Sequence, residues 1–197
     1  GLGDVYKRQS YAYVNGKRVA RLKGEGYFQV SKDRKHPFVV QVGNLNIEVL
    51  GTCFNVYSYE ENDFVETSLI EGSVRLYDSK SPSESFILKP SQKAIYSKNN
   101  GKISFHNTDN VKETAWTQNH LVFESEKLGS VFQKIERWYG VHIDLLCPEI
   151  ANDQISGSFK DEQLPYVMEA LKFQYGFNYE ITGNNVTINK SNQLKIK

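Results

Sequence analysis

Hydrophobic residues follow two different periods along this chain, one in each half. Between about Val19 and Tyr96 they alternate with polar residues and include many β-branched and aromatic side chains, which is typical of strands with one buried face. Clusters of turn residues divide this half at positions 33–37, 43–44, 60–63 and 78–85. The pattern predicts that the first half is an all-β domain.

Three glycines in this half each lead into an alternating segment, namely Gly26, Gly51 and Gly72. A repeat of that kind marks the corners of a stacked β-roll, whereas isolated glycines also occur at the ordinary strand bends of a β-sandwich. Because the spacings are irregular, the sequence leaves both architectures open.

A helical period replaces the alternation in the second half. Apolar residues between 128 and 139 recur three and four positions apart, and Gly140 follows them, which predicts a helix that ends at a left-handed glycine. A second helix is predicted over 164–175, with Pro165 in its first turn and Gly176 after its end.

Short apolar segments surround these two helices, at 121–123, 141–145, 155–159, 179–181 and 186–188. Their order with the helices is β-α-β-β-α-β-β, so we expect a small domain with two helices on one face of a small sheet. The fold class is therefore predicted as α+β with two domains, a β-domain over 10–107 and an α+β domain over 118–190.

Composition and charge exclude several classes of protein. With 39% hydrophobic residues, the chain can bury a core and is expected to fold. The 24 Lys and Arg residues are balanced by 23 Asp and Glu residues, which leaves a formal charge of +1 and argues against nucleic acid as a partner. No run approaches the ~20 apolar residues that a membrane-spanning helix needs.

Residue types that carry catalysis or bind metals lack the spacing that such sites need. Cys53 and Cys147 lie far apart within apolar runs and are expected to be inert buried thiols. Residues 24–26 (Gly-Glu-Gly) are not followed by Lys-Ser/Thr and do not form a phosphate loop. The four histidines are scattered, at His36, His106, His120 and His142. We therefore expect no enzyme activity, no metal and no cofactor.

Several segments of the first half resemble known sequence signatures. Residues 18–30 (RVARLKGEGYFQV), followed by PFVVQV at 37–42, are similar to the start of the FecR domain. Residues 49–56 (VLGTCFNV) and 69–76 (LIEGSVRL) resemble its next two signatures. One departure is Ser91, which stands where the family usually has a glycine after the proline.

The second half resembles the C-terminal domain that follows FecR domains in regulators from Bacteroidetes. The similar segments are 115–116 (AW), 121–123 (LVF), 135–141 (IERWYGV) and 155–159 (ISGSF). That domain looks like the secretin and TonB N-terminal signalling domain, in agreement with the order of elements above. The resemblance covers residues 11–190, nearly the whole chain.

The resemblance implies a function in signal transduction. It implies that the chain is the periplasmic, signal-receiving ectodomain of a FecR-type anti-sigma regulator, and that it binds the signalling domain of a TonB-dependent outer-membrane transducer. The full-length protein would cross the inner membrane once. An extracytoplasmic-function sigma factor would be contacted only by a cytoplasmic domain, which this sequence lacks.

The first residues depart from the family pattern. Residues 1–9 (GLGDVYKRQ) fit neither the family nor a strand, and we interpret them as an expression or sequence-assembly remnant, or as a local substitute for lost strands. The family has further strands before Arg18, and these are missing. We therefore expect the β-domain to expose an unpaired edge near 19–22, or to cover that edge with the foreign N-terminal residues.

Three aromatic residues are candidates for partner binding. Trp138 and Tyr139 end the first predicted helix, where an aromatic pair can anchor an interface, although their place in the helix stripe also fits core packing. Trp116 precedes the second domain and would either wedge between the domains or join the core of the second. Partner binding is expected to belong to the second domain.

A different class of function is left open as an alternative. The chain would then be a cell-surface carbohydrate- or ligand-binding β-domain with an accessory α+β module. That reading requires solvent-facing aromatic residues on the β half, such as Tyr57, Tyr59 and Tyr77.

Overall fold

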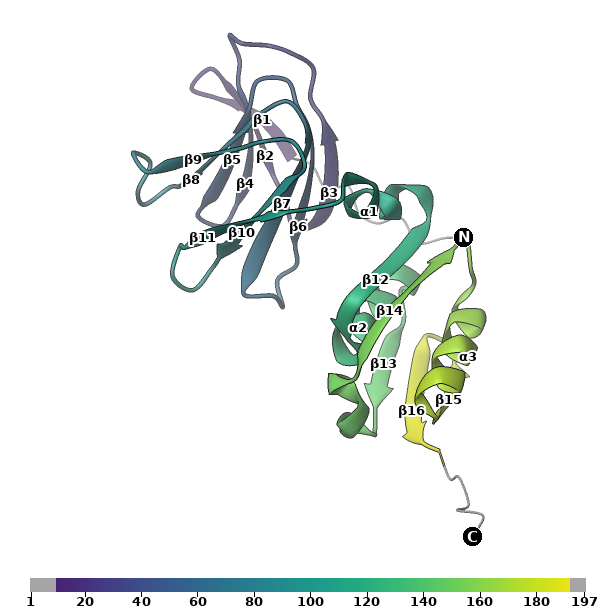
Figure 1. Ribbon diagram of the computed structural model, residues 1–197. Helices are drawn as coiled ribbons and strands as arrows, with labels where there is room; N and C mark the ends of the chain where they lie inside the picture. Colours follow the sequence, from purple (N-terminus) through teal and green to yellow (C-terminus); the bar gives the residue numbers. More distant parts are fainter. Residues whose placement is uncertain (1–9, 192–197) are drawn as a thin grey trace. The chain divides into compact units, whose positions relative to one another are not determined.

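The structure, a computed structural model, describes residues 10–191 and divides them into two compact units, 10–117 and 118–191 (Figure 1). The first unit is mostly β and the second is α+β, which confirms the predicted fold class. The interpretation of residues 1–9 as a remnant lies outside the described residues. No helix among residues 10–191 is long and apolar enough to cross a membrane.

The first unit is a β-sandwich of two sheets. Sheet A has six strands in the order β1 (Ser10–Val14), β2 (Lys17–Arg21), β4 (Phe38–Val42), β5 (Leu45–Val49), β8 (Val74–Asp78) and β9 (Ser85–Leu88). Sheet B has five strands in the order β11 (Ile103–Asn107), β10 (Gln92–Ser97), β7 (Phe64–Glu71), β6 (Cys53–Ser58) and β3 (Gly24–Gln29). The two packed sheets show that the sandwich, and not the β-roll, is the architecture.

The alternation in the sequence arises because each strand turns every second side chain into the space between the sheets. Val40, Ile47 and Leu76 from sheet A meet Phe54 and Leu69 from sheet B in one core, and none of the five is more than 1% exposed. Burial of such apolar area supplies the main stabilising free energy of the unit. Residues between them in sequence lie on the outer faces.

Two of the three repeated glycines mark a close approach between chain segments. Gly51 (φ +149°) and Gly72 (φ +97°) precede β6 and β8 with backbone angles that residues with a Cβ rarely adopt. A Cβ on Gly72 would lie 2.9 Å from the carbonyl oxygen of Gly51, and a Cβ on Gly51 would lie 2.6 Å from Lys32 Cα. Gly26 differs from both because it lies inside β3.

The N-terminal edge of sheet A differs from the expectation. Strand β1 forms a hairpin with β2 through Asn15 and Gly16, whose positive φ angles suit a tight two-residue turn. Strand β2 also pairs with β4 in parallel. The prediction of an unpaired edge at 19–22 is therefore wrong, because residues 10–14, which follow the suspected remnant, pair with this strand.

The second unit contains the predicted β-α-β-β-α-β-β order with one added turn of 3-10 helix. Its elements are β12 (His120–Lys127), α2 (Leu128–Tyr139), β13 (His142–Leu145), η2 (Pro148–Asn152), β14 (Gln154–Lys160), α3 (Leu164–Tyr175), β15 (Phe177–Thr182) and β16 (Asn185–Lys190). Both helices end where glycine was expected to stop them, at Gly140 and Gly176, each with φ +66°.

The strands of this unit form two small sheets, so the expected single sheet is wrong. Strand β14 pairs with β12, whereas β16 pairs with β13 on one side and β15 on the other. Helix α2 contacts both β12 and β13 and thereby touches both sheets. One core joins the helices and sheets, and its fully buried side chains include Phe123, Ile135 and Met168.

Candidate partner-binding surfaces

Trp138 and Tyr139 lie at the end of α2, as the sequence predicted, and both are only partly buried against the core of the second unit. The Tyr139 hydroxyl donates a hydrogen bond to the carbonyl oxygen of Glu162 (2.9 Å). Burial, assisted by the charge of Glu162, raises the pKa of Tyr139. The polar end of Tyr139 is therefore engaged within the unit, while each ring keeps some surface open.

Trp116 belongs to the first unit and is not a core residue of the second. Its indole Nε1 donates to Asn55 Oδ1 (3.1 Å) on the outer face of sheet B, and Asn55 Nδ2 donates in turn to Glu25 Oε1 (2.8 Å). Asn55 is only 3% exposed. Of the two alternatives for Trp116, a place in the second core is wrong, because a polar partner on sheet B holds the indole, and a wedge between the domains stays a prediction.

Trp116 is part of a segment that lies along sheet B. Residues 108–117, called the strap below, contain α1 (Asn110–Glu113) and most of η1 (Ala115–Gln118). The N-terminus of α1 is capped by Asp109, whose carboxylate accepts from the Val111 N–H (2.9 Å). The strap starts at Thr108, whose N–H donates to the carbonyl oxygen of Ser91 (3.0 Å).

Glu113 is the centre of the polar contacts between the strap and sheet B. Its carboxylate accepts from Lys93 Nζ (2.6 Å), from the Ser68 hydroxyl (2.9 Å) and from the Thr108 hydroxyl. Lys93 also bridges to Glu66 (2.8 Å). Burial disfavours the Lys93 ammonium, but the charges of Glu66 and Glu113 outweigh it and raise the pKa of Lys93.

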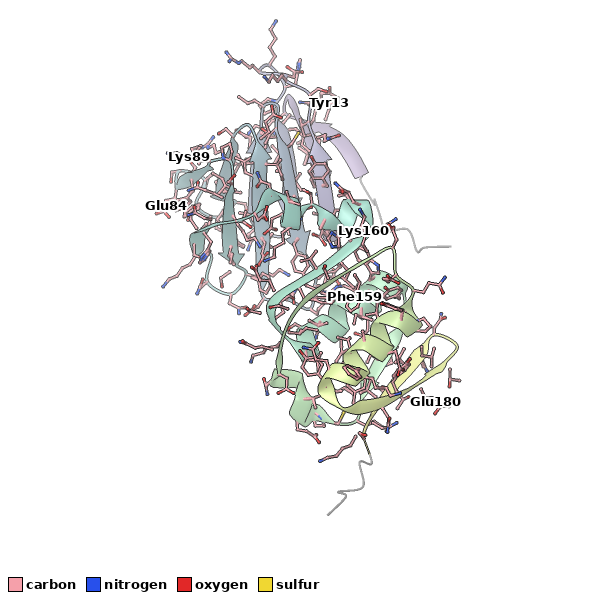
Figure 2. The ribbon with its side chains drawn as sticks, turned by 45° about the vertical axis from the view of Figure 1, so that its right-hand side comes forward. Tyr13, Glu84, Lys89, Phe159, Lys160 and Glu180 are labelled. Atoms are coloured by element: carbon pink, nitrogen blue, oxygen red, sulfur yellow. The ribbon has the colours of Figure 1, made fainter. Side chains whose placement is uncertain are left out.

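One edge of strand β14 has no strand partner in the described part of the chain, and most of the residues along it are exposed. Asp161 N–H donates to the carbonyl oxygen of Asn119 (3.0 Å), and because antiparallel pairs alternate, the N–H of Phe159 also faces β12. The N–H groups of Ser158 and Lys160 face the opposite side, where no strand pairs among residues 10–191. Figure 2 shows Phe159 and Lys160 as neighbours on β14.

The outer edge of β13 is partly occupied by a side chain. His142 N–H donates to Asn184 O (2.8 Å), so the next N–H along β13, that of Ile143, faces away from β16. That N–H donates to Glu136 Oε1 (2.6 Å), and His142 Nδ1 lies 3.0 Å from the same oxygen. A partner strand would have to displace Glu136 to pair there, so β14 is the more accessible of these two edges.

Helix α3 exposes two aromatic residues that the sequence analysis missed. Tyr166 is 61% exposed and Phe173 is 93% exposed. They are seven positions apart, which places them on one face two turns from each other. The spacing was visible in the sequence, but the core stripe formed by Val167, Met168 and Leu171 concealed it.

The tyrosines required by the carbohydrate-binding alternative do not form one platform. Tyr57 lies on the outer face of sheet B, where its ring stacks with Phe64 and meets Tyr59 edge to face. Tyr77 lies on the outer face of sheet A, beside Arg75. The two outer faces point in opposite directions, so no sugar could contact Tyr57 and Tyr77 together.

Metal and thiol chemistry have no visible site in the described part of the chain. No three His, Cys, Asp or Glu side chains among residues 10–191 are grouped so that they could hold a metal ion. Both cysteines are free, Cys147 being buried and Cys53 partly buried. Burial, with a smaller effect of Glu149, raises the pKa of the Cys147 thiol, which lowers its reactivity.

The fold is a β-sandwich followed by a small α+β unit in which one edge of β14 has no strand partner among residues 10–191. Two family profiles match the chain, FecR protein over residues 5–75 and FecR, C-terminal over residues 120–188. The chain belongs to the FecR family and carries a FecR domain followed by a FecR C-terminal domain. Members are non-enzymatic regulators, and the chain is not an enzyme.

Two solved structures are similar to both units together. Each is a candidate anti-sigma factor from Parabacteroides distasonis ATCC 8503, solved at 1.65 Å and 2.50 Å, and each is 29% identical to this chain. The first has a TM-score of 0.79 and covers 93% of this chain and 86% of its own. The second has a TM-score of 0.78, with 91% and 83% covered. No curated protein matches the chain.

Proposed function

We propose that this chain is the periplasmic, signal-receiving part of a transmembrane anti-sigma regulator. In this role it binds the signalling domain of a TonB-dependent outer-membrane transducer and so controls an extracytoplasmic-function sigma factor. The cytoplasmic segment of the full-length regulator holds the sigma factor. The observation that carries the proposal is the pairing of a FecR domain with a FecR C-terminal domain, shared in fold with a candidate anti-sigma factor.

The second unit is the proposed receiver of the signal. Its β-α-β-β-α-β-β order is the one expected for TonB N-terminal signalling domains, so like can pair with like through strand edges. Backbone pairing supplies affinity, while pockets for alternate side chains select the partner. The free edge of β14 at Ser158 and Lys160 fits this mode, and Trp138 and Tyr139 stay predictions for side-chain anchors.

Calorimetry against signalling domains encoded in the same genome tests the proposal. The intact chain should bind one of them, and Ser158→Pro should weaken that binding at least about tenfold, because proline removes an outward donor. Gly157 precedes the new proline and relieves the steric restriction on that position. The matched control, Ser158→Ala, keeps the N–H and should bind as the parent chain does.

Two outcomes count against the proposal. If no signalling domain of that genome binds the intact chain, the function is wrong. If a domain binds and Ser158→Pro has no effect, the function stands and the β14 edge is not the binding surface. No observation favours the carbohydrate-binding alternative, because Tyr57 and Tyr77 lie on opposite outer faces.

A further inference from the structure

The strap covers polar residues of sheet B that would otherwise meet water. Ser68 and Asn55 lie on the outer face of the sheet, yet they are 1% and 3% exposed. Glu113 and Trp116 supply their hydrogen-bond partners. The strap therefore takes the place of solvent on this face.

Polar contacts hold most of the strap in place, and its apolar burial is confined mainly to Ala115 and the partly buried ring of Trp116. Helix α1 has no buried residue, and Val111 within it is 76% exposed. Ala115 is the only residue of η1 that is buried. A segment held in this way can leave the surface without exposing a core, because water can replace its hydrogen bonds.

The position of the strap in the chain links it to the second unit. It ends at residue 117, and β12 of the second unit begins at His120. Asn119, between them, accepts the Asp161 N–H (3.0 Å) beside the end of β14. A strand that pairs with the free edge of β14 at Lys160 would therefore act within a few residues of the end of the strap.

We propose that the strap is a releasable latch that closes when no partner is bound and opens when the second unit binds its partner. The inference rests on the function proposed above. Opening frees residues 108–117, which as an extended tether between the two units can span a total of up to ~35 Å, at about 3.5 Å for each residue. It also uncovers Glu66, Lys93 and Ser68 on sheet B. The partner drives opening only if it binds the open form more tightly than the closed form.

Tryptophan fluorescence can follow the latch because the chain has two tryptophans. In a Trp138→Phe background, Trp116 is the only tryptophan and reports on the strap. Glu113→Gln and Ser68→Ala should raise its acrylamide quenching constant at least about twofold if local opening is favoured. Glu84→Gln is the matched charge control, since Glu84 is exposed and has no side-chain contact with the strap; it should change nothing.

Addition of the cognate signalling domain then tests the signal step. Binding should raise the quenching constant of Trp116 to that of the Glu113→Gln variant, and circular dichroism should confirm that each variant is folded. If the domain binds with measurable heat while Trp116 quenching stays unchanged, the latch is wrong and the proposed function stands. If Glu113→Gln and Ser68→Ala behave like Glu84→Gln, the strap is not releasable and the inference is also overturned. If no signalling domain binds the parent chain, in which Trp138 is present, the proposed function is wrong and the latch has no signal to transmit.

Discussion

The indole of Trp116 donates a hydrogen bond to the side chain of Asn55, although 61 positions separate them in the chain. Trp116→Phe removes this donor and leaves the Oδ1 atom of a buried Asn55 without its partner. We expect a loss of about 1–2 kcal/mol in the free energy of unfolding. Urea denaturation followed by circular dichroism measures it, and a double-mutant cycle with Asn55→Ala should show coupling. A cycle that is additive within experimental error would contradict the assignment.

Ser91 adopts a left-handed backbone (φ +62°) at the position where the resemblance led us to expect glycine. A residue with a Cβ pays about 1 kcal/mol or more for that conformation. Ser91→Gly should therefore raise the free energy of unfolding by about 1 kcal/mol, less the weak contact of its hydroxyl with Asn110 (3.4 Å). Ser91→Ala is the control, since it removes the hydroxyl and keeps the strain. Equal stability of the two variants would argue against backbone strain.

Tyr96 should make the sandwich sensitive to alkaline pH. Burial and the nearby Asp78 carboxylate, which accepts the phenol O–H (2.6 Å), raise the pKa of Tyr96 to about 12. A pKa that is higher in the folded state than in the unfolded state stabilises the folded protein. This contribution is fully present below the ordinary tyrosine pKa near 10 and is lost as pH rises toward 12. The loss attributable to this residue is about 2–3 kcal/mol. Urea unfolding at pH 8 and pH 11.5 should show a smaller pH dependence in Tyr96→Phe than in the parent chain.

The second unit should fold without the first. In the described part of the chain, its core is built from residues between Leu121 and Ile188. A fragment of residues 118–191 should unfold cooperatively in urea, and Met168→Ala, which creates a cavity at a fully buried site, should destabilise it by about 2–5 kcal/mol. Phe173→Ala is a control of opposite character because Phe173 is 93% exposed, so its effect should be near zero. A fragment without a cooperative transition would show that the unit needs the sandwich.

Charge removal in the strap should destabilise the first unit. Glu113→Gln leaves Lys93, which is largely buried, with one carboxylate fewer, and we expect a loss of about 1–3 kcal/mol. Lys102→Gln on an exposed part of the same sandwich should cost little, as isolated surface charges do. Denaturation of both variants at the same salt concentration compares their free energies of unfolding. An equal effect of the two substitutions would mean that the Glu113 network adds nothing.

Local signals in the sequence were sufficient to predict the helices and their ends. The 3.6-residue period of α2 and α3, with Gly140 and Gly176 behind them, depends only on neighbouring residues. Strand pairing was harder to predict because short alternating segments look alike. Nothing near 155–159 reveals that β14 pairs with β12 and not with β13, and the single predicted sheet failed for that reason.

The contacts of the strap with sheet B could not be predicted from the sequence, for a related reason. Glu113 and Ser68 are 45 positions apart, and a polar residue that bonds across such a distance looks like any solvated residue. The sequence indicated a role for Trp116 near the domain boundary, but no sequence pattern indicated that Asn55 would be its hydrogen-bond partner. Hydrogen bonds between distant polar side chains leave no periodicity to read.

The free edge of β14 has a consequence for solubility. Strands with open hydrogen-bonding groups are templates for fibrils when their side chains are apolar and flat. The outward residues here are Ser156, Ser158 and Lys160, around Gly157, and all four are exposed. Stacked copies would bring lysine ammonium groups together and would find no apolar surface to form a dry zipper. The exposed polar residues of this edge therefore disfavour stacking of copies even though its N–H groups have no strand partner in the described part of the chain.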